Sequence, residues 1–212
     1  VPTAVMASIA QKIKQYLQYE PLKNDQIIAL ISEHKLQNID NILKFIEESS
    51  LPIADLYKVC EMANISREEN AAYHTPIHIA YSSIEHLPNE TEFGAKITAL
   101  EPSVGAGIFV YLVAKKYPNR QIESDCVDID KNSLLVTQAL IQKLEIPNLS
   151  LNLINDDFVT SKSLKNNYNL IVGNPPFMKV KGKTLNLYRK GFFQSKSSNI
   201  FTYFIELSLK LG

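Results

Sequence analysis

The sequence predicts an α/β protein in which a mostly parallel, doubly wound sheet follows a small helical subdomain. Three observations support this prediction. Apolar residues recur at helical spacing through about residue 70, and the first glycine of the chain is Gly94. From about residue 95 onward, short apolar runs alternate with helical segments. Strands that alternate with helices in this way form parallel sheets with helices on both faces. We therefore expect a helical subdomain in residues 1–70 and an α/β domain in residues 71–212.

In the helical subdomain, the apolar positions form separate patterns, each typical of one amphipathic helix. These patterns cover residues 9–17, 27–31 and 39–46. The sequence of this region indicates no function.

Four apolar runs in the second domain are expected to form strands. They are residues 96–100, 122–127, 149–154 and 168–172. Helices are expected at about residues 107–116 and 131–144, with right-handed crossovers between the strands. Because ligands bind such sheets beyond the carboxyl ends of the strands, functional residues are expected directly after each run.

Composition and the chain ends limit the possible classes of protein. The 22 basic and 22 acidic residues cancel, so overall charge predicts no polyanionic partner, although a local patch is compatible with that total. Cys60 and Cys126 lack metal-ligand spacing, so we expect reduced, buried thiols, no metal site and a cytoplasmic protein. No apolar run is long enough to span a bilayer, and no signal-peptide pattern opens the sequence. The chain begins at Val1 and ends in an apolar helix running into Gly212, so we expect a fragment whose C-terminal strands are missing.

The first predicted strand ends at Glu101 and is followed by a turn that contains Gly105 and Gly107. Glycines at this turn let the backbone approach a ligand where a Cβ atom would collide. The third glycine of the dinucleotide-binding fingerprint is missing. A carboxylate at Glu101 suits a cationic amino-acid group and would repel a diphosphate.

The next two strands also end in carboxylates. Asp128, about 20 residues after the glycine turn, is expected to accept hydrogen bonds from both hydroxyls of a ribose. Ile129 could pack on an adenine face, and Asp130 is expected to be a helix N-cap. Asp157 is placed to accept from an adenine amine, while Phe158 packs on the ring. Acidic strand ends in three consecutive units predict S-adenosylmethionine as the cofactor.

The fourth strand is followed by Asn174-Pro175-Pro176-Phe177. Two prolines fix φ and remove two N–H donors, which leaves a rigid, extended turn. The side-chain oxygen of Asn174 and the carbonyl of Pro175 can then accept both hydrogens of a target amine and direct its lone pair toward a methyl donor. Phe177 offers a face on which a planar base can stack, and Pro176 is expected to contact the same substrate.

Residues 75–212 resemble the catalytic domain of the adenine-N6 DNA methyltransferases of restriction-modification systems. The resemblance rests on His74-Thr75-Pro76 with the helix after it, and on the segments EPSVGAG, VDID, NDDF, GNPPF and SSNIFTYFIELSLKL, in this order. It implies a Rossmann-like methyltransferase fold and double-stranded DNA with a flipped adenine as substrate. It also implies a restriction endonuclease domain or subunit as a possible partner.

The resemblance implies roles for individual residues. Thr75 would lie over the methionine end of the cofactor. The family's cofactor-binding and catalytic residues correspond to Glu101, Gly105, Gly107, Asp128, Asp157, Asn174, Pro175 and Phe177. The sequence departs from the pattern where Phe177 replaces the commoner Tyr, and where the chain ends before any recognition domain.

Residues 178–199 contain several Lys and Arg residues and no Asp or Glu. Lys179, Lys181 and Lys183 are the nearest to Phe177, and we expect them to contact DNA phosphates. A solvated, mobile surface loop is the alternative interpretation of this stretch, and the two are compatible.

Other functions remain compatible with these motifs. A protein-glutamine N5 methyltransferase shares the Asn-Pro-Pro-aromatic segment, because a side-chain amide is also a planar NH₂ group. The Glu-Pro opening of the glycine turn, the Thr-Pro helix and the basic stretch favour DNA instead. Methylation of cytosine N4, RNA or small-molecule amines is a further alternative. A non-catalytic methyltransferase-fold subunit of a restriction-modification complex is the alternative from another class.

Overall fold

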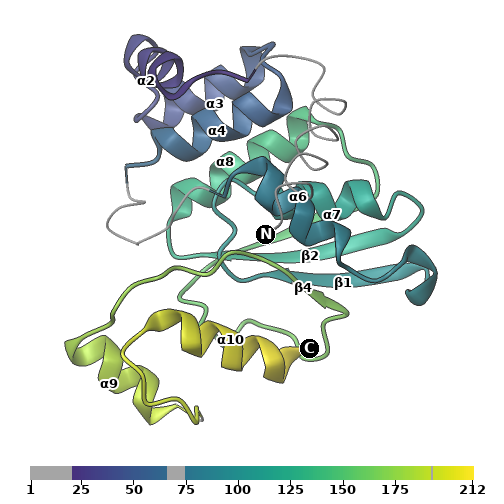
Figure 1. The fold of residues 1–212 in the computed structure, drawn as a ribbon, viewed down its shortest axis with the longest axis vertical. Helices are drawn as coiled ribbons and strands as arrows, with labels where there is room; N and C mark the ends of the chain where they lie inside the picture. The colour runs from purple at the N-terminus through teal and green to yellow at the C-terminus, as the bar shows by residue number, and fades with distance from the viewer. Residues whose placement is uncertain (1–20, 66–74, 192) are drawn as a thin grey trace, which may run out of the picture.

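The computed structural model describes residues 21–65, 75–191 and 193–212, and its centre is a four-stranded sheet (Figure 1). The strands are β1 (Lys96–Glu101), β2 (Gln121–Asp128), β3 (Leu149–Asn155) and β4 (Leu170–Ile171). Their order is β3-β2-β1-β4, and every pair is parallel. The predicted doubly wound α/β fold is therefore confirmed. Only the fourth strand is much shorter than expected, since its ladder with β1 covers only Leu170 and Ile171.

Helices cover both faces of this sheet, as Figure 1 shows. The crossover helices are α7 (Ile108–Lys116) and α8 (Lys131–Lys143), with α6 (Ile77–Glu85) on the same side and the short 3₁₀ helix η1 (Glu90–Glu92) before β1. On the other face lies α10 (Ile200–Leu211). Successive side chains of a strand point to opposite faces of the sheet. Ala99 belongs to the core under α7, whereas Leu100 packs with the α10 residues Tyr203 and Phe204.

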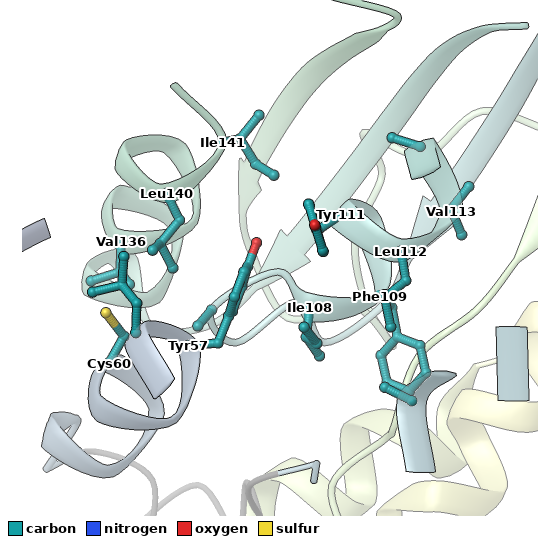
Figure 2. Close-up of a cluster of buried hydrophobic side chains, with 14 of the residues drawn as sticks. Tyr57, Cys60, Ile108, Phe109, Tyr111, Leu112, Val113, Val136, Leu140 and Ile141 are labelled. Carbon is teal, nitrogen blue, oxygen red and sulfur yellow. The ribbon is translucent and has the colours of Figure 1, made fainter. Parts of the chain in front are cut away.

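The described N-terminal helices are α2 (Asn24–Glu33), α3 (Ile39–Glu48) and α4 (Ile53–Ala63). They share one buried cluster with the sheet and its crossover helices. In Figure 2, Tyr57 and Cys60 of α4 lie among side chains of α7 and α8, and the Tyr57 and Tyr111 rings are 5.9 Å apart. The helix expected at residues 9–17 and the boundary expected near residue 70 lie outside the described residues.

The basic stretch after Phe177 is not only a loop. It contains α9 (Gly182–Lys190), and its two ends are joined where Val180 N–H donates to Ser198 O at 2.7 Å and Ile200 N–H to Met178 O at 2.9 Å. The alternative interpretation of residues 178–199 as a surface loop is corrected for Gly182–Lys190, which are helical. Tyr188, which is 3% exposed, anchors α9 to the core under α10, while most of the basic side chains stay exposed.

Both cysteines are free and buried, and burial raises the pKa of each thiol. No described helix is long and apolar enough to cross a membrane. Among the same described residues, no group of three His, Cys, Asp or Glu side chains could hold a metal ion.

The shared core leads to a prediction about cooperativity. Leu140 is 0% exposed, so Leu140→Ala should lower the free energy of unfolding by about 2–5 kcal/mol. The N-terminal helices and the sheet should unfold in one transition, followed in urea by circular dichroism and tyrosine fluorescence. Leu187→Ala, at a residue that is 55% exposed, is the matched control and should change little. Two separate transitions would show that the helices are an independent unit.

Candidate functional site

The candidate site lies at the switch point of the sheet. The chain runs outward from β1 to β2 and β3, and then returns to β4 on the other side of β1. In sheets of this kind the connections diverge there and leave a crevice beyond the strand ends. A cavity occupies this position, and its lining includes Glu101, Gly105, Asp128 and Asn174, together with residues of α4. Three of the strand-end residues predicted from the sequence, Glu101, Asp128 and Asn174, therefore converge on one site.

The glycine turn has a backbone that only glycine adopts easily. Gly105 has φ +55° and Gly107 has φ +83°, and Gly107 is the N-cap of α7. A Cβ atom on Gly107 would lie 2.7 Å from Cγ2 of Thr137, and one on Gly105 would lie 2.8 Å from Oε1 of Glu61. The turn therefore passes closely between α4 and α8.

Asp128 ties the glycine turn to the next loop. Its Oδ2 accepts the N–H of Gly105 and its Oδ1 accepts the N–H of Asp130, each at 2.9 Å. Burial raises the pKa of Asp128 to about 6, opposed by these two hydrogen bonds and reinforced by the carboxylates of Asp130 and Glu61. Each oxygen of a carboxylate has two acceptor positions, so Asp128 can still receive hydrogen bonds from a ligand.

Asp130 is the predicted N-cap of the helix that follows. Its side chain accepts the N–H groups of Asn132 at 3.1 Å and Ser133 at 3.3 Å. This prediction is confirmed.

Glu101 is almost completely buried at the end of β1, with 1% of its surface exposed. Its Oε2 accepts the N–H of Val110 at 3.2 Å. Burial holds the pKa of Glu101 well above its usual range, and the nearby charges of Glu61 and Asp128 raise it further. The cavity therefore favours a cationic ligand at this point, because a cation would restore the ionised carboxylate.

Asn174 and Thr75, 99 residues apart in sequence, meet at the cavity. Nδ2 of Asn174 donates to Oγ1 of Thr75 at 3.1 Å, and both residues belong to the lining. Among the described residues none donates to Oδ1 of Asn174. The side chain is thus oriented with its amide nitrogen engaged and its oxygen available.

Phe177 is 52% exposed, unusually for a phenylalanine. Its ring packs against Phe201 of α10 with centroids 5.7 Å apart and planes inclined at 37°. Pro175 and Pro176 between it and Asn174 are half-buried. An exposed aromatic ring therefore follows the cavity-lining Asn174 after two proline residues.

Three residues expected to contact the cofactor's adenine lie outside the cavity lining. Ile129 is 60% exposed, and Phe158 is 2% exposed and packs on Phe204 with ring centroids 4.8 Å apart. Asp157 accepts the hydroxyl of Tyr188 at 2.8 Å and the N–H of Val159 at 3.0 Å. Their contacts with a cofactor stay predictions. Lys179, Lys181 and Lys183 are exposed on the segment after Phe177.

Helix α4 and its C-cap Asn64 supply site residues that the sequence motifs did not indicate. Glu61 Oε1 accepts the N–H of Ala106 at 2.8 Å, and Asn64 Nδ2 donates to Asp130 Oδ2 at 2.8 Å. The hydroxyl of Tyr57 donates to the carbonyl of Gly107 at 3.4 Å. Positions 57, 61 and 64 have the i, i+4, i+7 spacing of one helix face. The recurrence of polar residues on that face is the sequence feature that could have indicated their part in the site.

Four parallel strands with flanking helices and a site at the β1/β4 switch point define a Rossmann-like α/β fold. One structure of this fold is a protein from Listeria monocytogenes that is described as a class I S-adenosylmethionine-dependent methyltransferase. It has a TM-score of 0.59 and 12% identity, with 94% of this chain and 68% of that chain covered. A Vibrio vulnificus protein that is described as a modification subunit of a type I restriction enzyme has a TM-score of 0.52 and 13% identity. That match covers 74% of this chain but only 34% of the Vibrio subunit.

The sequence itself identifies the family. Residues 45–212 match the model of the Eco57I restriction-modification methylase family, so the chain belongs to that family. No curated protein matches the chain significantly by sequence.

The close approach at Gly107 gives a prediction with matched controls. Gly107→Ala should be destabilising, because a left-handed φ costs about 1–2 kcal/mol for other residues and its Cβ would also collide with Thr137. Gly182 has a φ of +58°, and a Cβ atom added there would have nothing within 4 Å, so Gly182→Ala should show the backbone strain without a collision. Gly94→Ala should show neither the strain nor the collision. Thermal unfolding measures all three. A loss at Gly107 no larger than that at Gly182 would contradict the close packing.

Proposed function

We propose that this protein is an S-adenosylmethionine-dependent DNA methyltransferase of a restriction-modification system that methylates adenine at N6. The observation that carries the proposal is the position of Asn174. Its amide lies at the wall of the cavity, with the exposed ring of Phe177 close by in the chain. A group that holds an amine and a surface that holds a planar base are thus adjacent to the place proposed for the methyl donor.

The cavity fits the cofactor chemically. The described lining residues include four carboxylates, those of Glu61, Glu101, Asp128 and Asp130, and no Lys, Arg or His. S-adenosylmethionine carries a sulfonium and an ammonium group, and its electrophilic methyl group is the chemistry it supplies when bound. Glu101 would hold the ammonium, Asp128 would accept the ribose hydroxyls, and Thr75 would lie at the methionine end.

The residues after β4 would position the target base. Oδ1 of Asn174 and the carbonyl of Pro175 would accept the two hydrogens of the adenine amine, which directs the nitrogen lone pair toward the cavity. The hydrogen bond to Thr75 supports this arrangement, because it engages the amide nitrogen and leaves the oxygen for the amine. Phe177 would stack on the flipped base, with Pro176 beside it.

Contacts farther from the reacting atoms belong to the same proposal. Asp157, Ile129 and Phe158 would surround the adenine of the cofactor, and Asp157 could accept from the adenine amine while keeping its bond from Tyr188, because each carboxylate oxygen has two acceptor positions. The exposed lysines 179, 181 and 183, with the basic residues of α9, would contact DNA phosphates. We also propose a cytoplasmic protein that works with a restriction endonuclease domain or subunit.

The amine-holding role is tested by Asn174→Ala. The variant should lose methyl transfer to duplex DNA by more than about 100-fold, the scale of removing a group that stabilises the transition state, while cofactor affinity stays nearly unchanged. Tritiated methyl transfer and calorimetry on the full-length protein measure the two. Asn166→Ala, at an exposed asparagine remote from the cavity lining, is the control. Wild-type transfer to release-factor protein and not to DNA would favour the glutamine methyltransferase instead, and cofactor binding without any transfer would favour a non-catalytic subunit.

The pKa of Asp128 gives a pH dependence. The ribose hydroxyls donate to the ionised carboxylate, which forms only above a pKa of about 6, so cofactor affinity should rise as pH increases through that value. Asp128→Asn should remove this part of the rise and weaken binding by a few kcal/mol at most, the scale of its hydrogen bonds. Calorimetry between about pH 5 and about pH 8 tests this, with Asp25→Asn, at an exposed residue of α2, as the control. An unchanged profile in Asp128→Asn would refute the ribose assignment.

A further inference from the structure

Helix α9 has one face against the protein and one face toward solvent. Leu185 and Tyr188, three positions apart, form the inner face: Leu185 packs against the core under α10, and Tyr188 is buried in it. On the other side, positions 183, 186, 187 and 190 have the i, i+3, i+4, i+7 spacing of a single helix face. We call this set the outer face of α9, and its four exposed residues are Lys183, Asn186, Leu187 and Lys190.

The outer face of α9 combines positive charge with an apolar and an amide side chain. Lys183 and Lys190 lie at its two ends, and residues 178–199 contain no Asp or Glu that would neutralise them. Between them lie Asn186 and Leu187, and Leu187 is 55% exposed. Lysines alone would suffice for phosphates, which carry no sequence information. An amide can pair with both N6 and N7 of adenine, and an apolar side chain can contact the thymine methyl group, so this composition fits base edges as well as phosphates.

The supports of α9 hold this face in one orientation. The hydroxyl of Tyr188 donates to Oδ2 of Asp157 at 2.8 Å, which ties the helix to the turn after β3. In the segment after α9, the N–H groups of Gln194 and Ser195 donate to the carboxylate of Glu206 on α10, at 2.6 and 3.0 Å. Side chains on a well-supported helix are positioned more precisely than side chains on a loop, as the recognition of a base edge requires.

We propose that α9 is a DNA-reading helix whose outer face enters the major groove of the substrate duplex. This inference rests on the proposed function. Lys183 and Lys190 contact phosphates, while Asn186 and Leu187 contact the edge of an A·T base pair. The major groove admits an α-helix and presents a distinct pattern for each base pair. Helix α9 begins shortly after Phe177, the residue proposed to stack on the target base, so bases close to the target are the ones within its reach.

The phosphate contacts are tested by the salt dependence of DNA binding. Fluorescence anisotropy on the full-length protein measures affinity for a random-sequence duplex at several salt concentrations. The double variant Lys183→Gln/Lys190→Gln should reduce the slope of log affinity against log salt by about 2, because each phosphate contact contributes about 0.9. Lys44→Gln, at an exposed residue of α3 at the opposite end of the molecule, should leave the slope unchanged. An unchanged slope in the double variant would overturn the inference and favour an acidic protein as the partner of this face.

The base contacts are tested by the sequence context of methylation. Plasmid DNA is treated with the full-length protein, and sequencing maps the methylated adenines and the bases around them. Asn186→Ala should reduce discrimination at one A·T position by at least about 5-fold, the lower end for a bidentate base contact. Leu187→Ala should relax the same position or a neighbouring one. Asn166→Ala, at an exposed asparagine outside residues 178–199, is the control, and affinity for S-adenosylmethionine should stay unchanged in all three variants.

The outcomes separate this inference from the proposed function. If the wild-type protein methylates no DNA, the proposed function itself fails. If it methylates adenine in a defined context, and neither Asn186→Ala nor Leu187→Ala alters that context, the DNA-reading role of α9 is overturned while the proposed function stands. Slower methylation in an unaltered context would also overturn that role, and would show that α9 supports the active site without reading bases.

Discussion

The carboxylate of Asp128 is the group on which the geometry of the site depends. By accepting the N–H groups of Gly105 and Asp130, it fixes the turn after β1 relative to the turn after β2. Burial opposes ionisation of this group and the two N–H groups favour it, and its pKa of about 6 shows that burial is the larger effect. Two adjacent strand ends are thus held together by a carboxylate whose charge depends on pH near neutrality.

The glycine turn has a second support on its opposite side. Tyr57 and Glu61 of α4 contact Gly107 and Ala106, and the C-cap residue Asn64 contacts Asp130. Helix α4 is itself fixed by the core that it shares with α7 and α8. This explains why the turn needs two glycines with left-handed φ. The backbone passes between α4 and α8 at distances where a Cβ atom would touch Glu61 or Thr137. The N-terminal helices therefore belong to the site as well as to the core.

The sequence predicted the sheet closely, because each strand is rich in apolar residues and a recognisable signal, such as the Asp130 N-cap, marks where a crossover helix begins. It also predicted that Glu101, Asp128 and Asn174 converge, since parallel strands end at one edge. The role of Glu61 was not predictable from motifs, because it depends on how α4 docks on the turn, a contact between residues 45 positions apart. Helix α9 was missed because its apolar positions are few. Tyr188 forms its buried anchor through contacts that only tertiary structure creates.

Although the net charge of the chain is zero, its acidic and basic side chains gather in different regions. Carboxylates line the cavity, whereas residues 178–199 carry basic side chains and no acidic ones. In Figure 1, α9 lies at the opposite end of the molecule from α2, α3 and α4. Under the proposed function this separation solves an electrostatic conflict, because a polyanion and an acidic cavity repel each other. Only an uncharged base needs to approach the cavity, while the phosphates stay with the lysines. Asn174 and Phe177 lie between the two regions in sequence, where a neutral amide and an aromatic ring add no charge of either sign.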